Sequence, residues 1–271
     1  MHGMSYRKET EIAIRIAKEA GQLLVERLSQ KRTIQHKATL SIVTDADHAS
    51  EAHIIQTLRR EFPDHDIMSE ETATKLTGAP YCWIIDPLDG TTNYAHNYPS
   101  FCVSIALAEQ MQPVVGVVYH PMMHELFVAE RGRGARLNDT PIRVSSISAL
   151  DDALLATGFP YDRRERPDYY LKFYREFMIR TQGLRRAGAA AIDLSYIACG
   201  RYDGFWEFGL SPWDVAAAML LITEAGGTVT NFDGGPAQLN DQRILATNGK
   251  LHQPMLDVIK DIEPTSTITT R

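Results

Sequence analysis

The feature that most constrains this chain is an apolar stretch that ends in two aspartates, Trp83–Asn93, which reads Trp-Ile-Ile-Asp-Pro-Leu-Asp-Gly-Thr-Thr-Asn. The two isoleucines predict a buried strand, the proline cannot donate to a β-ladder and is expected to end that strand, and the glycine permits a tight turn. Asp86 and Asp89 should therefore lie together at the end of a strand. Two carboxylates held in one place need a cation between them, or one of them must take up a proton. The stretch thus predicts a divalent-metal site.

The composition is that of an ordinary globular protein. With 271 residues, 44% of them hydrophobic, the chain can bury a large core as one domain or as two closely packed halves. A formal net charge of −6 argues against a nucleic-acid binder that neutralises many phosphates. It does not exclude an anionic substrate, because bound cations can reverse the local field.

Nothing in the sequence indicates export or a membrane. Cys82, Cys102 and Cys199 lack metal-ligand spacing and have apolar or aromatic neighbours, so they are interpreted as small buried hydrophobes of a reduced compartment. The N-terminus has no apolar core of signal-peptide length, and no apolar run approaches the length of a membrane span. We therefore expect a cytoplasmic protein that does not contact a membrane.

The first half begins with two helices and continues with strands. Hydrophobic periodicity predicts an amphipathic helix over residues 5–29 and a second one that starts within residues 41–47 and runs through Leu58. Thr44, Asp45 and Asp47 lie around the second start, where helix capping is the alternative to a role in a site. A short strand then leads to Glu70 and Glu71, although adjacent glutamates are usually solvated surface. Three β-rich segments, residues 101–108, 114–119 and 125–130, predict an antiparallel meander.

The second half alternates between strands and helices. It predicts strands over residues 153–157, 183–186, 204–207, 228–231 and 244–247, and helices over residues 169–180, 189–199, 215–225 and 253–262. Helices that cover a mixed sheet give an α/β layered sandwich. The serine-rich segment 143–150 is the best candidate for a seam, which divides the chain into halves 1–145 and 146–271 of one compact unit.

A third aspartate lies where a helix rich in small residues begins, in Pro212-Trp213-Asp214. Asp is among the preferred N-cap residues, so capping alone would account for this acid. Its occurrence together with Asp86 and Asp89 favours a role in the same site. The helix is followed by two consecutive glycines, Gly226-Gly227, which occur together with these aspartate motifs.

Taken together, these motifs resemble those of the inositol monophosphatase family of magnesium-dependent, lithium-sensitive phosphomonoesterases. The resemblance runs from the first helix to about Gly249 and rests on Trp83–Asn93 and on Trp-Asp-Val-Ala-Ala-Ala, which starts at Trp213. Arg186–Ala190 and Asp203–Glu207 are similar to the bacterial extragenic-suppressor branch. The resemblance implies an αβαβα sandwich of the type shared with fructose-1,6-bisphosphatase.

The resemblance also implies a set of metal ligands for two to three Mg²⁺ ions per site. Glu70, Asp86 and the carbonyl of Leu88 would hold the first ion, and Asp86, Asp89 and Asp214 would hold the second. A weaker third ion would rest on Glu70 and water. Mg²⁺ prefers hard oxygen ligands, which this set supplies.

In the mechanism that the resemblance implies, a metal-activated water attacks phosphorus and no phosphoenzyme forms. Glu70 and Thr91 would act on that water, with Thr91 hydrogen-bonded to Asp47, and the backbone N–H groups of Gly90 and Thr91 would meet the phosphoryl charge. The positions implied in substrate binding are Asp89, Gly90, Thr91, Gly188, Ala189, Ala190, Glu207 and Asp214. For Glu207 the alternative is an exposed glutamate at the end of a strand.

Two residues depart from the family pattern. Ala189 stands where many relatives carry Ser or Thr, so one hydroxyl contact is absent. Ser41 stands where Asp is usual before Val-Thr, which weakens the assignment of the basic loop around Lys37 as a lid close to the metals. Neither departure touches the predicted metal ligands.

The resemblance implies hydrolysis of a small phosphorylated polyol, inositol monophosphate, by a homodimer. Within the same class, fructose 1,6-bisphosphate, adenosine 3′,5′-bisphosphate and histidinol phosphate are alternative substrates. The rival hypothesis is a partner of the transcription machinery with secondary phosphatase activity. Arg185 and Arg186 would then face protein or RNA, unless they are solvated or lie at a dimer interface.

Overall fold

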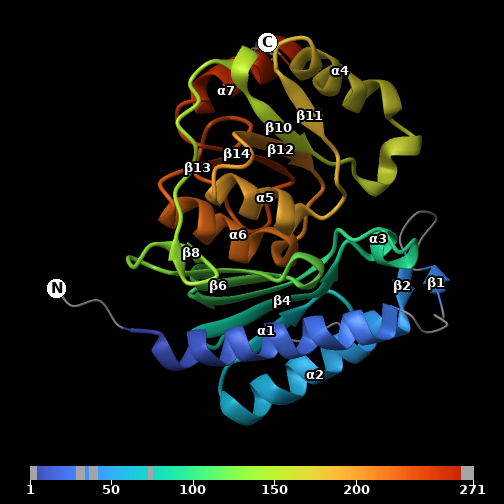
Figure 1. Ribbon diagram of the computed structural model, residues 1–271, viewed down its shortest axis with the longest axis vertical. Helices are drawn as coiled ribbons and strands as arrows, with labels where there is room; N and C mark the ends of the chain where they lie inside the picture. The colour runs from blue at the N-terminus through green and yellow to red at the C-terminus, as the bar shows by residue number, and fades with distance from the viewer. Residues whose placement is uncertain (1–4, 29–33, 37–41, 73–75, 264–271) are drawn as a thin grey trace, which may run out of the picture.

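The computed structural model describes residues 5–28, 34–36, 42–72 and 76–263, and it is a five-layered sandwich (Figure 1). The helical layers are α1 (Arg7–Leu28) with α2 (Asp45–Glu61), then α5 (Ala190–Ala198) with α6 (Pro212–Glu224), and then α4 (Pro167–Met178) with α7 (His252–Ile262). A seven-stranded sheet separates the first two layers and a five-stranded sheet the last two. The αβαβα architecture is therefore confirmed.

The seven-stranded sheet follows chain order. Its strands are β3 (Asp66–Ser69), β4 (Tyr81–Asp89), β5 (Cys102–Glu109), β6 (Gln112–His120), β7 (Glu125–Glu130), β8 (Ala135–Leu137) and β9 (Thr140–Pro141). Only β3 and β4 run parallel, and the other neighbours are antiparallel. The expected meander is thus present, extended at both edges.

The five-stranded sheet is mixed. In spatial order its strands are β11 (Gly183–Arg185), β10 (Leu154–Thr157), β12 (Gly204–Phe208), β14 (Arg243–Thr247) and β13 (Thr228–Asn231). β10 is parallel to both of its neighbours, and β14 is antiparallel to both of its own. The remaining elements are the pair β1 (Ile34–His36) and β2 (Ile42–Thr44), helix α3 (Thr91–Ala95), and the 3₁₀ turns η1 (Pro121–Met123), η2 (Leu150–Asp152) and η3 (Tyr161–Arg164).

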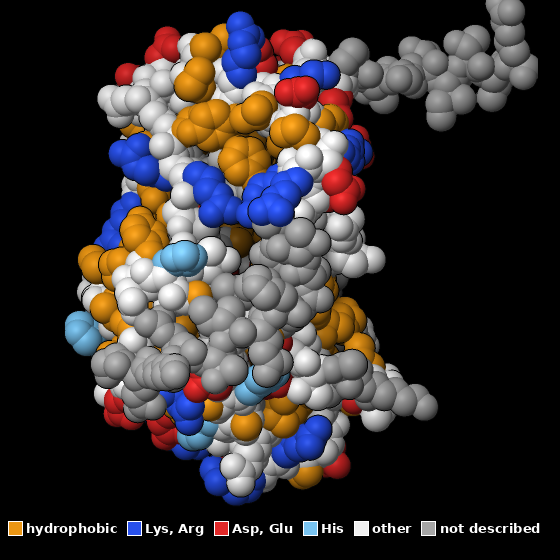
Figure 2. Space-filling model, turned by 90° about the vertical axis from the view of Figure 1, so that its right-hand side faces the viewer, with side chains coloured by type: hydrophobic (Ala, Val, Ile, Leu, Met, Phe, Trp, Pro, Cys, Tyr) orange, Lys and Arg blue, Asp and Glu red, His pale blue; other side chains and the backbone are white. Residues whose placement is uncertain are grey.

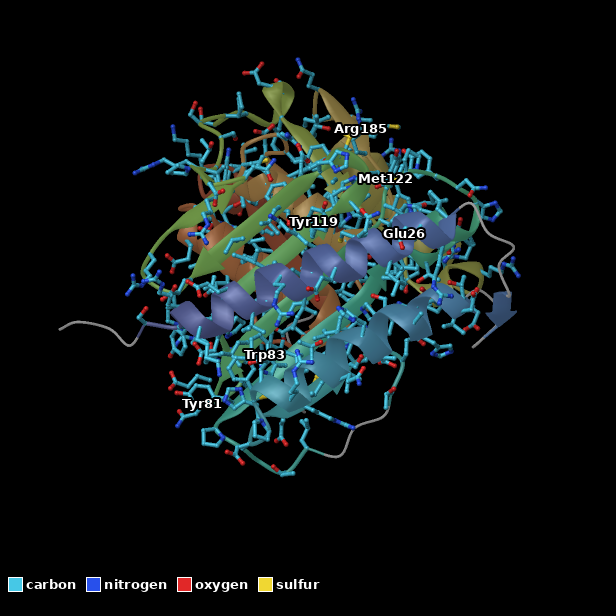
Figure 3. All side chains as sticks on the ribbon, turned by 60° about the horizontal axis from the view of Figure 1, so that its bottom comes forward. Glu26, Tyr81, Trp83, Tyr119, Met122 and Arg185 are labelled. Atoms are coloured by element: carbon cyan, nitrogen blue, oxygen red, sulfur yellow. The ribbon has the colours of Figure 1, made fainter. Side chains whose placement is uncertain are left out.

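Alternate residues of the seven-stranded sheet enter different cores. On β4, Trp83 and Ile85 belong to the core under α1 and α2, where Tyr119 and Met122 also pack (Figure 3). Ile84 belongs to the core that the sheet shares with α5 and α6. Because successive side chains of a strand point to opposite faces and both faces are covered, this strand is almost continuously apolar.

Helix α6 packs closely against β6, near the centre of that sheet. A Cβ atom on Gly116 of β6 would come within 2.5 Å of the carbonyl oxygen of Ala217, so only glycine fits there. The run of alanines in α6 serves the same approach, because small side chains let a helix and a sheet come together. The small residues of α6, which are visible in the sequence, therefore determine how closely this helix packs against the sheet.

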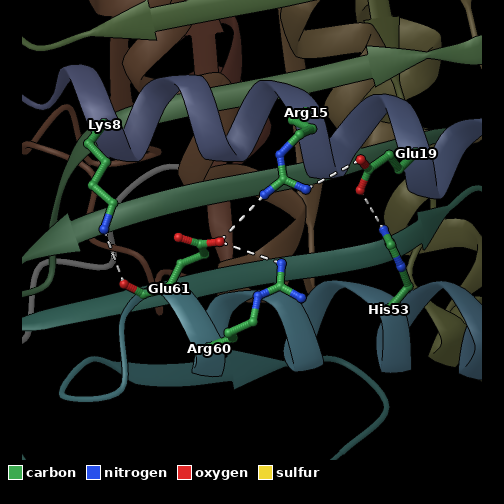
Figure 4. A network of polar contacts seen from close by, with 6 residues as sticks. All are labelled: Lys8, Arg15, Glu19, His53, Arg60 and Glu61. Atoms are coloured by element: carbon green, nitrogen blue, oxygen red, sulfur yellow. Dashed lines mark hydrogen bonds and ion pairs between the residues drawn. The ribbon is translucent and has the colours of Figure 1, made fainter.

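Helices α1 and α2 are joined by polar contacts along one side (Figure 4). Arg15 of α1 contacts Glu19 at 3.3 Å and Glu61 of α2 at 3.8 Å, and His53 Nε2 lies 2.8 Å from Glu19. Such exposed pairs contribute about 0–1 kcal/mol each, so the apolar core beneath them holds the layer in place. Helix α2 starts at Asp45, within the expected window of residues 41–47. Lys37 and Ser41 lie outside the described residues.

The two sheets are separate along the chain. Every strand of the seven-stranded sheet lies before residue 145 and every strand of the five-stranded sheet lies after residue 146. The division into halves 1–145 and 146–271 remains a proposal. Within the described ranges, none of the helices combines the length and the apolar character that crossing a bilayer requires.

Candidate active site

Strand β4 does not end at Pro87, as the sequence predicted, but continues to Asp89 through an irregularity. Asp86 pairs with Ser104 and Asp89 pairs with Cys102, so two residues of β4 oppose one residue of β5. In a regular strand, positions three apart point to opposite faces. The extra residue brings Asp89 back to the face of Asp86, and proline is tolerated there because a bulge needs no ladder donor.

The bulge is held by specific contacts. Ser50 of α2 donates a hydrogen bond to the carbonyl of Pro87 at 2.8 Å, and the Leu88 N–H donates to Asp86 Oδ1 at 3.0 Å. The chain then turns at Gly90, whose φ of 89° lies in the left-handed region and whose added Cβ would lie 2.8 Å from the Ser100 carbonyl oxygen. The conformation after the two aspartates therefore requires glycine.

Glu70 follows β3 directly, and its loop is fastened by a residue that the sequence did not single out. Glu51, buried on α2, accepts hydrogen bonds from the hydroxyl of Ser69, from the Thr72 N–H at 3.0 Å and from the Thr72 hydroxyl at 2.6 Å. Both of its oxygens are used in this way. Helix α2 thus positions the backbone on both sides of Glu70.

Asp214 is the third residue of α6 and does take part in capping. One of its oxygens, Oδ2, accepts the Ser211 N–H at 2.7 Å. Its other oxygen accepts no hydrogen bond from the described residues, and the side chain lines the same cavity as Asp86 and Asp89. Capping and membership of the site are therefore compatible, since they use different oxygens.

Asp47 shows the same division of labour. As the third residue of α2 it accepts the Thr44 N–H at 2.8 Å on Oδ2, while Oδ1 accepts the Thr91 hydroxyl at 3.1 Å. The Thr91 hydroxyl also lies 3.1 Å from the carbonyl oxygen of Leu88. The Thr91–Asp47 hydrogen bond that the resemblance implied is present.

These elements surround a cavity of ≈ 160 Å³. All the site residues predicted from the sequence line it except Asp47, which reaches it through Thr91. The predicted residues among its lining are Glu70, Asp86, Leu88, Asp89, Gly90, Thr91, Gly188, Ala189, Ala190, Glu207 and Asp214. Residues from both sheets and from α6 thus converge. Asn93 ties the two sides together, because its Nδ2 donates to Ser100 at 2.7 Å and to Ala187 at 2.8 Å.

Burial and mutual repulsion dominate the electrostatics of this cavity. Burial, followed by the charges of Glu70, Asp89 and Asp214, holds the pKa of Asp86 well above its ordinary value. Burial raises the pKa of Asp89 to about 6, against the hydrogen bond that the Ala191 N–H donates at 2.8 Å. Burial and the charge of Asp89 raise the pKa of Asp214. The carboxylates therefore favour a bound proton or a bound cation.

The donor chemistry fits a hard divalent cation. Asp86 and Asp214 each have one oxygen fixed by a backbone N–H and a second oxygen that accepts no hydrogen bond from the described residues. In that same part of the chain, no three His, Cys, Asp or Glu side chains are gathered tightly enough to hold an ion as they stand. Because like charges repel, these carboxylates should lie farther apart without a cation than they would when they bind one. Oxygen-only ligands suit Mg²⁺.

The wall opposite the β4 acids is formed by the second half. Glu207 of β12 is not a plain surface residue, because a Cβ on Gly158 would overlap its carboxyl group, with 1.9 Å to Oε1. Burial, followed by the charge of Asp193, raises its pKa well above the ordinary value. Asp193 and Arg186 also line the cavity. On the side of the molecule that carries α3, Lys and Arg side chains gather beside a hollow (Figure 2).

Sequence reasoning missed Glu51, Gly158 and Asp193. Glu51 and Asp193 are buried acids on helices, and a charged residue among the apolar positions of a helix is the one signal that could have marked them. Gly158 gives no local signal, because its role depends on a side chain in a different strand.

Comparisons with known proteins agree with this arrangement. The model of the inositol monophosphatase family matches residues 5–263. The chain is 47% identical to the inositol-1-monophosphatase of Synechocystis sp. over 90% of this chain and 86% of that protein, and 45% identical to the Nus factor SuhB of Pseudomonas aeruginosa over 94% and 97%. The solved structure of an inositol monophosphatase from Anabaena (Nostoc) sp. is similar with a TM-score of 0.88 and 44% identity, over 97% of this chain and 99% of that chain.

Proposed function

The chain belongs to the inositol monophosphatase family, and from that premise we propose that it hydrolyses inositol monophosphate to inositol and phosphate. Membership makes it a phosphatase of this family, whose enzymes generally depend on a metal. The observation that carries the proposal is the convergence of Glu70, Asp86, Asp89 and Asp214 on one cavity from the end of β3, from β4 and from α6. The name of the Synechocystis relative supports the choice of substrate.

Two to three Mg²⁺ ions are the proposed cofactor. Glu70, Asp86 and the carbonyl of Leu88 would hold one ion, Asp86, Asp89 and Asp214 a second, and Glu70 with water a weaker third. When bound, such ions neutralise the carboxylates, activate water and stabilise charge on the phosphoryl group. The all-oxygen donor set supports Mg²⁺ over softer metals.

The protein groups would orient the attacking water and the substrate. Because Thr91 donates its hydroxyl hydrogen to Asp47, the lone pairs of Thr91 Oγ1 are left to accept a hydrogen bond from the water, and Glu70 would accept a second one. Water, not a side chain, attacks phosphorus, so no phosphoenzyme forms. The proposed phosphoryl contacts are the N–H groups of Gly90 and Thr91.

The alcohol of the substrate would occupy the wall opposite β4. Asp89, Glu207 and Asp214 would accept hydrogen bonds from its hydroxyls, and the loop of Gly188, Ala189 and Ala190 would form the floor. Ala189 supplies no hydroxyl, so recognition there would rest on shape and on backbone groups.

Asp89→Asn tests the assignment. Phosphate release from inositol 1-monophosphate by the purified protein with Mg²⁺ should fall by at least ~10²-fold, because the substitution removes a carboxylate from the ligand set while keeping its shape. Asp139→Asn is the matched control, since Asp139 is 96% exposed and does not line the cavity. Full activity in Asp89→Asn would contradict the metal assignment.

The substrate is tested with a panel. Inositol 1-monophosphate should give a higher kcat/KM than fructose 1,6-bisphosphate, adenosine 3′,5′-bisphosphate or histidinol phosphate, and lithium should inhibit the reaction. If one of the three alternatives gave a higher kcat/KM, that compound would be the preferred substrate instead of inositol monophosphate. The reaction class would stay the same.

A second proposed function is a partner role in the transcription machinery, favoured by the Nus factor SuhB relative. The two functions separate in Asp89→Asn, which should lose phosphatase activity and keep the cellular role if that role depends on binding. We also propose that the protein is cytoplasmic and forms a homodimer. The exposed hydrophobic side chains Leu171, Met178 and Ile179, which are 50%, 54% and 57% exposed on or just after α4, support the dimer. Analytical ultracentrifugation measures the oligomeric state directly.

A further inference from the structure

Asp193 lies in the first half of α5 and lines the cavity, although no motif marks it. It is 1% exposed, and its helix also supplies the Ala191 N–H that holds Asp89. Asp193 therefore borders the site from helix α5, near Asp89.

Asp193 has no hydrogen-bond partner within the described residues. Its Oδ1 is fully buried without one, and neither oxygen forms an ion pair there. In the same ranges, the other Asp and Glu residues that are at most 8% exposed each accept a hydrogen bond from a backbone N–H, a hydroxyl or an arginine, as Asp203 does from the Leu154 N–H at 2.7 Å and Glu125 does from Arg201. Asp193 is the exception.

An unpartnered buried carboxyl group lowers the stability of the folded protein. Burial also disfavours its charged form and so raises the pKa of Asp193 well above its ordinary value. Groups of this kind are retained where a ligand completes them. The acids around Asp193 are Glu207 and Asp89, which can only accept hydrogen bonds when ionised. A ligand group that satisfies all three must therefore donate several hydrogen bonds.

Hydroxyl groups of a polyol meet that requirement, and a phosphoryl group does not, because it brings acceptors and negative charge. We propose that Asp193 is a specificity-determining contact that accepts a hydrogen bond from a hydroxyl of the leaving alcohol, beside Glu207. This inference rests on the proposed phosphatase function. It assigns the α5 side of the cavity to polyhydroxylated alcohols.

Asp193→Ala tests the contact, with Asp193→Asn as the conservative variant. Loss of one hydrogen bond to a carboxylate should lower kcat/KM for inositol 1-monophosphate by roughly 10- to 100-fold in the alanine variant and less in the asparagine variant, whose amide oxygen still accepts. Hydrolysis of p-nitrophenyl phosphate, which has no alcohol hydroxyls, should change by less than about twofold. Ser195→Ala, on the same helix and outside the cavity lining, is the matched control.

Thermal unfolding of the free protein gives the second readout. Removing an unpartnered buried carboxyl group should leave the midpoint of thermal unfolding unchanged or raise it. If Asp193 instead stabilised the fold, its removal would lower the midpoint. Equal losses on both phosphates, or a lower midpoint in Asp193→Asn, would overturn the inference. If the wild-type protein hydrolyses neither phosphate, the proposed function itself fails.

Arg186 is the alternative partner, since its charge lowers the pKa of Asp193. A double-mutant cycle with Arg186→Gln separates the two roles. If Asp193 contacts the substrate, Asp193→Ala should still lower kcat/KM about tenfold or more in the Arg186→Gln background. No further loss in that background would mean that Asp193 acts by holding Arg186, and would overturn the inference.

Discussion

At the scale of single residues, the site depends on which oxygen of each carboxylate is already engaged. Asp47 and Asp214 both cap a helix with one oxygen and turn the other toward the site. From the sequence, capping and a role in the site were alternatives for both acids, and the structure shows that capping engages only one oxygen of each. A local sequence pattern can predict the helix start, because the capped residues are nearby in the sequence. It cannot predict the environment of the second carboxylate oxygen, because that environment is formed by segments distant in the sequence.

Glu51 gives a prediction at this scale. Glu51→Ala removes the acceptor for Ser69 and for both donors of Thr72, so the free energy of unfolding should fall by about 1–3 kcal/mol. Because the loop that carries Glu70 is then loosely held, kcat should fall as well. Urea denaturation and phosphate release measure the two effects.

Glu51→Gln is the control for that experiment, since its amide keeps one acceptor oxygen and should retain part of both properties. Wild-type kcat in Glu51→Ala would show that the loop places Glu70 without this helix.

At the scale of elements, the sequence predicted most helices and strands within a few residues, because long periodic segments carry a strong signal. Helix α4 and helix α7, expected over residues 169–180 and 253–262, run Pro167–Met178 and His252–Ile262. The error at β4 has a physical cause. Pro87 was expected to stop the strand, but a β-bulge accommodates a residue without an N–H, and bulges leave no periodic signal.

The depth of α6 gives a prediction at this scale. Gly116→Ala places a methyl group 2.5 Å from the carbonyl oxygen of Ala217, so α6 must move away from β6. We expect a loss of about 1–3 kcal/mol in the free energy of unfolding and a lower kcat, because Asp214 moves with the helix.

The comparison for Gly116 is Gly132→Ala, where a Cβ would meet nothing within 4 Å and only the backbone cost of a positive φ applies. That variant should lose stability and keep kcat. Equal kcat in the two variants would contradict the link between the depth of α6 and the site.

At the scale of the whole molecule, the buried acids couple stability to pH and to metal. The pKa of Asp89 is about 6 in the folded protein, above its unfolded value, so the folded protein binds this proton more tightly. The resulting stabilisation, on the order of 3 kcal/mol, is complete below about pH 4 and is lost as the pH rises through 6. Burial raises the pKa values of Asp86 and Asp214 in the same direction, so both acids add to this loss as the pH rises.

The midpoint of thermal unfolding in chelator should therefore fall between about pH 5 and pH 8. Mg²⁺ should reduce this slope, because a cation that binds only the folded protein replaces the proton. Asp89→Asn should show a smaller slope in chelator than the wild-type protein. A midpoint that rises with pH in chelator would refute this account.

The layer formed by α5 and α6 has a consequence for how such a chain can diverge. Both helices are enclosed between two sheets, and their side chains are almost all buried or partly buried. They have no broad face in water on which neutral substitutions could accumulate, and each replacement must fit a core to which both sheets contribute. Sequence drift should therefore be slowest in this middle layer and fastest on the outer sides of α1, α2, α4 and α7.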